Sequence, residues 1–211
     1  FKIYTWPEVV EFDDTPILFM PWINVTNYND SLDLLKTAKA EIIMGHLEIH
    51  GFEMYKGYKG EGGYDKHLFS RFDTVMSGHY HHKSDDGQIY YLGTPHEIYW
   101  NDYEDPKGFH IFDTSTRELE RIVNPNTIFK KIFYDDTHKE YIREDMEEYK
   151  DKYVKLIVVN KKDLYQFDMF VDKLLKVDSH EVKIIEDFSE LGAENVSDDI
   201  IENTENTMSL L

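Results

Sequence analysis

Two short apolar runs that end in the same dipeptide constrain the fold more than any other feature of the sequence. Residues 42–46 (IIMGH) and residues 72–79 (FDTVMSGH) each lead from a strand-like run into Gly-His. A run with helical character, residues 31–40, precedes them, with Ser31 as its expected N-cap. Strand, helix and strand in alternation predict an α/β layered domain, in which ligands bind beyond the carboxyl ends of the strands.

Further strand-like runs surround this unit. Residues 1–22 contain short β-rich runs broken by Pro7, Asp13-Asp14 and Pro16, which favours a meander or hairpin near the edge of a sheet. After residue 88 no long helix interrupts the strand-like runs, and a turn at 113–117 (DTSTR) predicts antiparallel pairing. The expected fold class is therefore α/β (α+β), a sandwich of mixed sheets with flanking helices. The later runs are 89–95, 108–114, 117–123 and 128–134.

The pattern changes after residue 140 to a strand, a helix and a strand. The expected strands are 153–159 and 181–186, and the helix is 162–177. This βαβ unit is expected to form a small separate domain whose helix covers a sheet with one apolar stripe. Beyond Lys183 there are eight Asp or Glu and no Lys or Arg, a composition typical of a solvated linker. The stripe consists of Leu164, Phe167, Val171, Leu174 and Leu175.

Composition excludes several classes of function. No cysteine is present, so disulfides and thiolate metal sites are excluded, and any metal must bind to histidine, carboxylate or amide groups. The net charge of −19 argues against broad, nonspecific adhesion to DNA, although metal ions can supply local positive charge to a nuclease. No apolar run approaches the roughly 20 residues needed to cross a bilayer, so a soluble protein is expected, and the lack of cysteine fits the cytoplasm.

The histidines that follow the two strands are candidate metal ligands. His79 and His81 are two residues apart, so only an irregular loop turns both toward one centre, and His46 follows the other strand. Such a set suits two ions about 3.5–4 Å apart, and neutral imidazole suits Mn, Fe, Co, Ni or Zn. Metal affinity is then expected to fall below about pH 6 as the imidazoles are protonated. The alternative is that the histidines only decorate a surface loop.

The remaining histidines are expected to have lesser roles. Three lie near the candidate ligands in the sequence and are expected to support them or to lie on the surface. Four are expected to have no part in the site. The first group is His50, His82 and His96, and the second is His67, His110, His138 and His180.

Four ordered motifs resemble those of the calcineurin-like metallophosphoesterases. They are GHLEIHG (45–51), SGHYHH (77–82), YLGTPHE (91–97) and EDPKGFHIFDT (104–114). Within that family they are most similar to the SbcD or meiotic recombination eleven type of DNA repair nuclease, especially its T-even phage branch. The resemblance extends from Phe1 to Glu186. It implies a partial phosphoesterase β-sandwich at 1–137, a DNA-capping domain at 138–187, and an acidic linker at 188–211 that leads toward a truncated ATPase-binding segment.

The resemblance also implies a chemistry. Two Mn²⁺ ions, or Mg²⁺ or another divalent ion, would activate water to cut DNA phosphodiester bonds. His46 and His79 would bind one ion and His81 the other, while Gly45 and Gly78 would let their loops bend. Partners would be double-stranded DNA ends and an SMC-like ATPase. A homodimer would form through a region upstream of Phe1, and the protein would act in the cytoplasm, that of the host cell if it is viral.

The sequence departs from the family pattern in one respect. The family's Asp-x-His, Gly-Asp-x-x-Asp and Gly-Asn-His elements are missing, and DTH (136–138) and DSH (178–180) follow the histidine motifs instead of preceding them. The catalytic residues and the bridging carboxylate are therefore expected upstream of Phe1, and the 211 residues alone are expected to be inactive. Lys107 and Gly108 lie in a matched motif without an assigned role.

Two other functions stay open at this point. One is a metallophosphoesterase for small phosphodiesters or nucleotides, against which the βαβ unit and the ordered motifs argue. The other is a truncated module that binds DNA or a protein partner without catalysis. Hydrolysis of a small phosphodiester, compared with degradation of DNA ends, separates the first of these from a nuclease.

Overall fold

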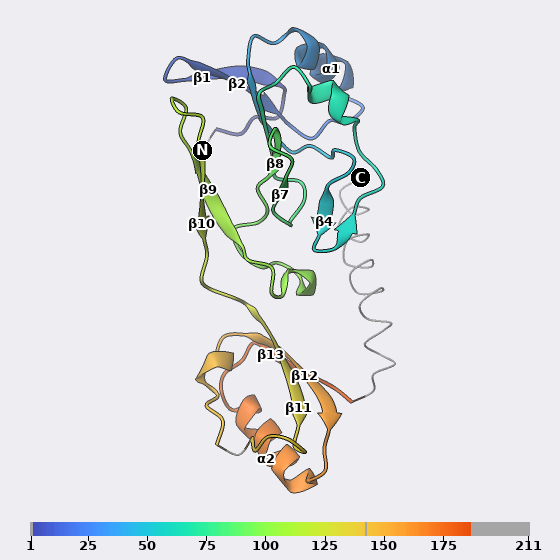
Figure 1. Ribbon diagram of the computed structural model, residues 1–211, viewed down its shortest axis with the longest axis vertical. Coiled ribbons are helices and arrows are strands. Elements are labelled where there is room, and N and C mark those ends of the chain that lie inside the picture. Colours follow the sequence, from blue (N-terminus) through green and yellow to red (C-terminus); the bar gives the residue numbers. More distant parts are fainter. Residues whose placement is uncertain (1, 142, 187–211) are drawn as a thin grey trace. The chain divides into compact units, whose positions relative to one another are not determined.

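The chain forms two compact units (Figure 1). The computed structural model describes residues 2–141 and 143–186. The first unit contains Phe1–Ile98 and Glu104–Pro125, and the second contains Tyr99–Tyr103 and the chain from Asn126 onward. The expected acidic linker at 188–211 lies outside the described residues.

The second unit begins earlier than residue 138, the boundary expected from the sequence. Among the described strands, Phe129–Asp135 pairs only with the one that follows it, Tyr153–Asn160. Residues 99–103 also belong to this unit, because their aromatic rings pack on it: the rings of Trp100 and Phe129 are 4.6 Å apart. Strand pairing, which a linear pattern does not reveal, therefore sets the boundary.

A six-stranded sheet forms the centre of the first unit, in the order β1-β2-β3-β6-β8-β7. β1 and β2 form an antiparallel hairpin at one edge, as expected, while β2, β3, β6 and β8 run parallel. Antiparallel pairing was expected for β8, and it is found with β7, whereas β8 runs parallel to its other neighbour, β6. The strands are β1 Glu8–Phe12, β2 Thr15–Met20, β3 Ile42–Gly45, β6 Thr74–Ser77, β7 Ser84–Asp85 and β8 Ile89–Tyr91.

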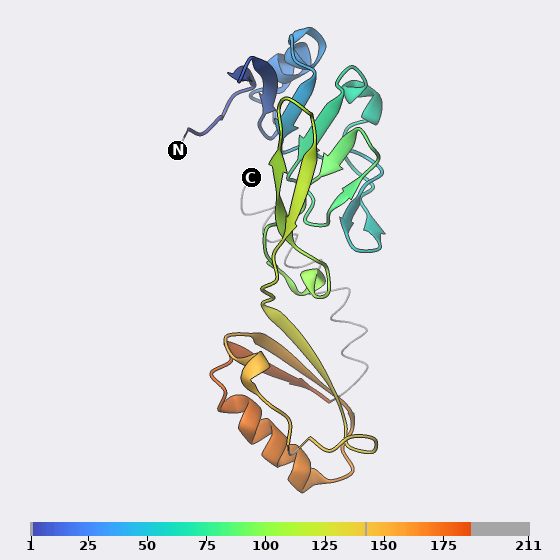
Figure 2. The same ribbon diagram turned by 60° about the vertical axis from the view of Figure 1, so that its left-hand side comes forward.

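Alternate residues of these strands pack on opposite faces of the sheet. Leu18, Ile43 and Val75 join the core on the face that α1 covers. Their neighbours Ile17 and Ile42 join a smaller cluster on the other face, against which the hairpin β9–β10 packs through Phe112 and Leu119 (Figure 2). The antiparallel hairpin expected around the turn at 113–117 is confirmed. The elements are α1 Tyr28–Thr37, β9 Gly108–Phe112 and β10 Leu119–Val123.

Helix α1 begins before its expected N-cap. Asn27 occupies the N-cap position without a side-chain capping hydrogen bond, while Ser31 lies inside the helix and is fully buried. Asn27 is held by its own turn, since its Oδ1 accepts from the Asn24 N–H at 2.8 Å and its Nδ2 donates to the Trp22 carbonyl at 3.0 Å. A local turn thus decides where the helix starts. At the C-terminal end of α1, the Arg71 guanidinium donates hydrogen bonds to the carbonyls of Leu35 and Ala38.

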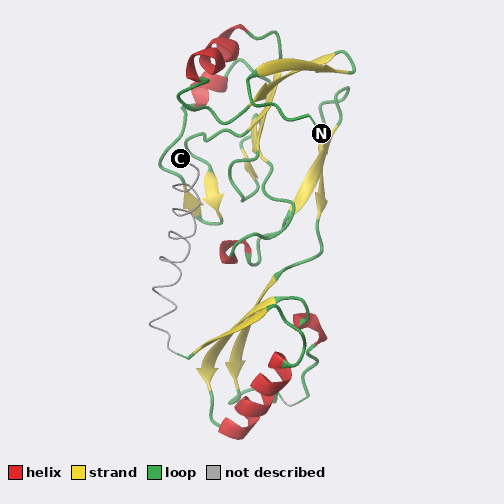
Figure 3. Cartoon of the chain, turned by 180° about the vertical axis from the view of Figure 1, so that it is seen from behind, coloured by secondary structure: helices red, strands yellow, loops and turns green. Residues whose placement is uncertain are grey.

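The second unit has a three-stranded parallel sheet covered on one face by α2 (Figure 3). The expected βαβ unit is confirmed, and Asp163 caps the helix by accepting from the N–H groups of Tyr165 and Gln166. Antiparallel pairing was expected for β11, and this is wrong, because residues 136–152 return the chain to the start of the sheet. The elements are β11 Phe129–Asp135, β12 Tyr153–Asn160, α2 Leu164–Leu175 and β13 Glu181–Ile185.

Smaller elements complete the two units. No helix among the described residues is long and apolar enough to span a membrane. The small elements are β4 Glu53–Tyr55, β5 Tyr58–Lys59 and the 3₁₀ turns η1 Lys66–Phe69, η2 Trp100–Asp102 and η3 Glu147–Tyr149.

Candidate functional site

His46 and His79 follow the carboxyl ends of the neighbouring parallel strands β3 and β6. Gly45 and Ser77 are partners in the ladder that joins these strands. The pairing continues past the strand ends, since the His46 N–H donates to the Met20 carbonyl at 3.2 Å and the Gly78 N–H donates to the Gly45 carbonyl at 3.1 Å. The two histidine side chains therefore meet at one edge of the sheet, where ligands bind in open α/β folds.

The two imidazoles are in direct contact. His46 Nε2 and His79 Nδ1 are 3.1 Å apart, and the ring centroids are 4.9 Å apart with an interplanar angle of 81°. Trp22 lies against both, with its ring 4.8 Å from that of His79 and 5.6 Å from that of His46. Two imidazole nitrogens at about 2.0–2.1 Å from one metal ion lie roughly 3 Å apart, so the spacing suits two ligands of one ion.

Two ligands alone do not complete a metal site. Among residues 2–141 and 143–186, no group of three or more His, Asp or Glu side chains is placed to hold a metal ion. His81 is close enough to lower the pKa of both His46 and His79 by its charge. The structure thus brings two of the three expected ligands into contact and places the third in their electrostatic neighbourhood.

Both contacting histidines favour the neutral form. Burial, followed by the charges of His46 and His81, lowers the pKa of His79 from 6.5 to about 4. Burial and then His81 lower the pKa of His46. Both rings are therefore neutral near pH 7, and neutral imidazole is the form that binds metal ions. Loss of metal affinity was expected below about pH 6. Because the pKa of His79 is about 4, protonation of His79 would weaken metal binding only at a lower pH.

An NMR titration of the metal-free chain checks this directly. The imidazole signals of His79 are expected to keep their neutral positions until the pH approaches about 4. Because the unfolded chain binds this proton more tightly than the folded chain, lowering the pH from 6.5 to about 4 removes stability. A His79 midpoint near the ordinary value of 6.5 would contradict the half-buried environment of its ring beside His46.

Two buried hydroxyl groups hold the loop that follows His46. Ser77 Oγ donates to the Leu47 carbonyl and accepts from the Leu47 N–H, both at 2.9 Å. Tyr91 Oη also donates to the Leu47 carbonyl and accepts from the Ile49 N–H, both at 2.8 Å. All of these groups are buried, so each bond would cost about 1–3 kcal/mol to leave unmade. Ser77 and Tyr91 therefore fix the path of the chain next to His46.

The two glycines differ in what they contribute. A Cβ at Gly45 would lie 2.4 Å from the Met20 carbonyl oxygen, so β2 and β3 approach each other more closely than any side chain allows. A Cβ at Gly78 would meet nothing within 4 Å. The expectation that both permit a bend has no support at Gly78. At Gly45 the reason for glycine is the close backbone approach.

This difference predicts that two similar substitutions change the stability of the chain by different amounts. Gly45→Ala is expected to lower the free energy of unfolding by about 1–3 kcal/mol, because the contact is with backbone that must shift. Gly78→Ala serves as the matched control and is expected to change it by less than about 0.5 kcal/mol. Urea unfolding followed by circular dichroism measures both. Equal losses in the two variants would contradict the close approach at Gly45.

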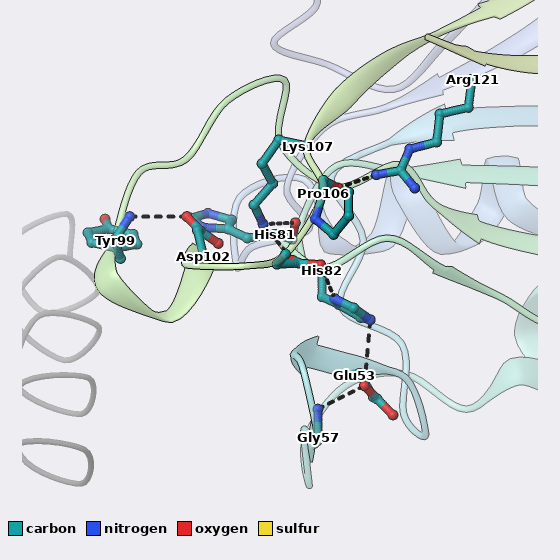
Figure 4. Close-up of polar contacts among 10 residues, drawn as sticks. Glu53, Gly57, His81, His82, Tyr99, Asp102, Pro106, Lys107 and Arg121 are labelled. Atoms are coloured by element: carbon teal, nitrogen blue, oxygen red, sulfur yellow. Dashed lines mark hydrogen bonds and ion pairs between the residues drawn. The ribbon is translucent and has the colours of Figure 1, made fainter. Parts of the chain in front are cut away.

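A buried polar network lies beside His81 (Figure 4). Lys107 Nζ donates to the His81 carbonyl at 3.0 Å and to Asp105 Oδ2 at 2.8 Å. The other Asp105 oxygen contacts His82 Nδ1 at 3.0 Å, and His82 Nε2 lies 3.6 Å from Glu53 Oε2. The Lys107 and Asp105 side chains are 3% and 7% exposed. This ion pair therefore anchors the backbone of the histidine loop, and it gives Lys107 a positioning role.

A pocket of about 290 Å³ opens next to His46. Glu48 and Tyr64 are among its polar lining residues, and Trp22 forms part of its wall. The pocket therefore includes one of the two contacting histidines in its wall. The lining residues are Trp22, Ile23, His46, Leu47, Glu48, Gly63 and Tyr64.

Comparison with known proteins gives one informative match. No family model matches the chain. Over 185 residues the chain is 32% identical to a protein called exonuclease subunit 1 of Enterobacteria phage T4. The alignment covers 87% of this chain and 52% of that protein, so the chain spans about half the length of the curated relative it matches. The similarity is to a phage nuclease subunit. It supports the nuclease type expected from the four motifs.

Seven histidines were not among the expected ligands. Five of them are exposed, and the part of the chain described here places none of them in a metal-binding group. His110 is half-buried on β9, and burial, followed by Arg121 and Lys83, lowers its pKa. His82 differs from the surface role considered for it, because it belongs to the network with Asp105. The exposed five are His50, His67, His96, His138 and His180.

Proposed function

We propose that this chain is part of a recombination and repair nuclease subunit that hydrolyses phosphodiester bonds of double-stranded DNA with Mn²⁺. The observation that supports it most is the 32% identity to a phage exonuclease subunit over 87% of the chain. The paired neutral imidazoles at the carboxyl edge of a parallel sheet add a chemical reason. An SMC-like ATPase as partner, a homodimer, and action in the host cytoplasm belong to the same proposal.

The residues present fit part of a two-metal site. His46 and His79 would hold one ion through neutral nitrogens, and His81 would face the second. Bound ions of this kind activate a water molecule and neutralise the phosphate. Ser77, Tyr91 and the Lys107 network hold the loops in place. A bridging carboxylate is not supplied by the described residues and would come from another segment of the subunit.

Paramagnetic NMR with Mn²⁺ tests the ligands, even where binding is weak. Mn²⁺ is expected to broaden the imidazole signals of His46 and His79 first, and this early broadening should be lost in the double variant His46→Ala/His79→Ala. The matched control is His67→Ala/His180→Ala, which removes two exposed histidines. Broadening that begins at His67 or His180, or persists in the double variant, would refute the proposed ligands.

A nuclease assay tests the reaction. The purified 211 residues are expected to leave labelled duplex ends intact in Mn²⁺, whereas a subunit that also contains an Asp-x-His, a Gly-Asp-x-x-Asp and a Gly-Asn-His segment is expected to degrade them. In that longer protein, His79→Ala should abolish degradation. Hydrolysis of a small phosphodiester without degradation of DNA would favour the small-substrate phosphoesterase instead.

A further inference from the structure

Glu48 is a half-buried carboxylate in the wall of the pocket described above. It lies two residues after His46, between the buried residues Leu47 and Ile49. Among residues 2–141 and 143–186, its carboxylate makes neither a hydrogen bond nor an ion pair. A charge that is partly withdrawn from water and unpaired is unfavourable. A ligand that donates hydrogen bonds to Glu48 would offset this cost.

Tyrosines lie near Glu48 without donating to it. Burial and then the Glu48 charge raise the pKa of Tyr80 to about 12. Burial, followed by Tyr28 and Glu48, raises the pKa of Tyr64. The Tyr80 hydroxyl is buried and has no hydrogen-bond partner in the described part of the chain, while the Tyr91 hydroxyl donates to a backbone carbonyl. The oxygens of the Glu48 carboxylate are therefore left to accept from a bound molecule.

Two glycines leave room beside the carboxylate. A Cβ at Gly62 would lie 2.8 Å from Glu48 Oε1, and a Cβ at Gly63 would lie 2.8 Å from the Glu48 carbonyl oxygen. Gly63 also has a φ of 98°, in the left-handed region that favours glycine. The Tyr64 N–H donates to the same carbonyl at 2.8 Å. The backbone of residues 62–64 is therefore held against Glu48, and residues 62 and 63 place no side chain over its carboxylate.

Trp22 gives the same pocket an aromatic wall in a fixed position. Its carbonyl accepts from Asn27 Nδ2 at 3.0 Å and from Asn24 Nδ2 at 3.3 Å. Its ring packs beside those of His46 and His79. The residue is nevertheless 42% exposed, so part of it is open to a ligand. Aromatic side chains of this kind stack on nucleobases, because every base has a π-face.

The size and chemistry of the pocket suit a nucleobase. Its volume of about 290 Å³ is at the small end of the range for ligand sites. A carboxylate only accepts hydrogen bonds, and in nucleic-acid recognition it accepts from amino groups such as N4 of cytosine. Thymine has a carbonyl oxygen where cytosine has that amino group. A polar group that a ligand leaves unpaired discriminates strongly against that ligand, so thymine fits the pocket less well.

We propose that the pocket is a base-selective nucleotide site, in which a base stacks on Trp22 and donates its exocyclic amino group to Glu48. Cytosine, adenine and guanine have such a group, and thymine has none. Base binding itself requires no metal ion. The consequence for cleavage rests on the proposed nuclease function, because His46 belongs both to the pocket and to the proposed metal site. DNA ends would be degraded more slowly where thymine occupies the pocket.

NMR titration of the full chain in EDTA, with deoxycytidine and with thymidine, tests this site. Neither nucleoside has a phosphate, so no metal ion contributes to the binding. Deoxycytidine is expected to shift the Trp22 indole N–H signal and to bind at least about fivefold more tightly than thymidine. In Glu48→Gln the two affinities should come within about twofold of each other, since an amide both donates and accepts. Trp22→Ala should weaken binding of both nucleosides about tenfold, followed through the Gly63 amide signal.

Glu61→Gln and Trp6→Ala are the matched controls. Glu61 is exposed beside Gly62, Trp6 is 47% exposed, and neither lines the pocket. Both variants are expected to keep the affinity for deoxycytidine and the preference over thymidine within about twofold of the native chain. Native-like circular dichroism of every variant confirms folding.

Three results would overturn the base-selective site. Deoxycytidine could leave the Trp22 signal in place up to its solubility limit, thymidine could bind equally well, or Glu48→Gln could retain the native preference. Because the titration contains no metal ion and no DNA, such a failure leaves the proposed nuclease chemistry untouched. Selective binding of deoxycytidine by a protein that degrades no DNA would instead refute the nuclease and leave the base site.

Discussion

Leu174→Ala is expected to lower the free energy of unfolding of the second unit by about 2–5 kcal/mol. Leu174 is 0% exposed and packs in the cluster that joins α2 to the sheet, together with Phe167 and Phe170. Removal of three carbon atoms from this position loses their transfer free energy and leaves a cavity that close-packed neighbours fill only in part. Native-state hydrogen exchange of the β12 amides in increasing urea measures the loss within this unit.

The neighbouring leucine provides the control. Leu175 is 60% exposed, so Leu175→Ala removes the same atoms from the same helix without opening a cavity. Its expected effect is less than about 0.5 kcal/mol. Similar losses of stability in Leu174→Ala and Leu175→Ala would show that α2 does not turn the face with Leu174 toward the sheet.

The same pair of leucines shows where a sequence pattern stops being sufficient. The expected stripe included both, and it also included Leu164, which is 62% exposed. Phe170, which is 0% exposed, was left out of it. Adjacent helical residues point about 100° apart, so one stripe could not bury Leu174 and Leu175 equally. Which of several apolar residues becomes buried depends on the sheet, whose shape is absent from the local pattern.

Strand positions followed from the sequence more readily than strand pairing. The apolar runs at 42–46 and 72–79 became neighbouring parallel strands, as the α/β pattern predicted. The hairpin around 113–117 also followed from a local turn signal. The parallel pairings of β8 with β6 and of β11 with β12 did not, because they depend on how loops return the chain to the sheet. Those loops contain no periodic pattern from which a direction could be inferred.

The same distinction applies to the site. Contact between His46 and His79 follows from two strand ends at one sheet edge. The groups that hold their loops were missed, because their partners are backbone atoms far away in the chain. Ser77 and Tyr91 bond Leu47 across 30 and 44 residues. The only available signal for Lys107 was its place in a quoted motif, which indicated that it mattered without indicating how.

Lys107→Ala is the substitution expected to damage the first unit most. It removes one member of a buried ion pair. The Asp105 carboxylate, which is 7% exposed, then keeps only His82 as a partner in the network described above. Breaking a buried pair in this way costs about 3–5 kcal/mol. The His81 carbonyl also loses its 3.0 Å bond from the ammonium group. Urea unfolding followed by native-state exchange in β6 and β8 measures the loss in stability.

A solvent-exposed lysine of the same unit separates this effect from loss of charge alone. Lys66 pairs with Asp86 at 2.7 Å, but their side chains are 47% and 32% exposed, so Lys66→Ala is expected to cost less than about 1 kcal/mol. A positioning role adds a second readout. In NMR spectra of folded Lys107→Ala without urea, the amide and imidazole signals of His81 should shift, while those of His67 stay in place. Comparable destabilisation by Lys66→Ala, or an unchanged His81 spectrum in Lys107→Ala, would show that the buried pair does not hold the histidine loop.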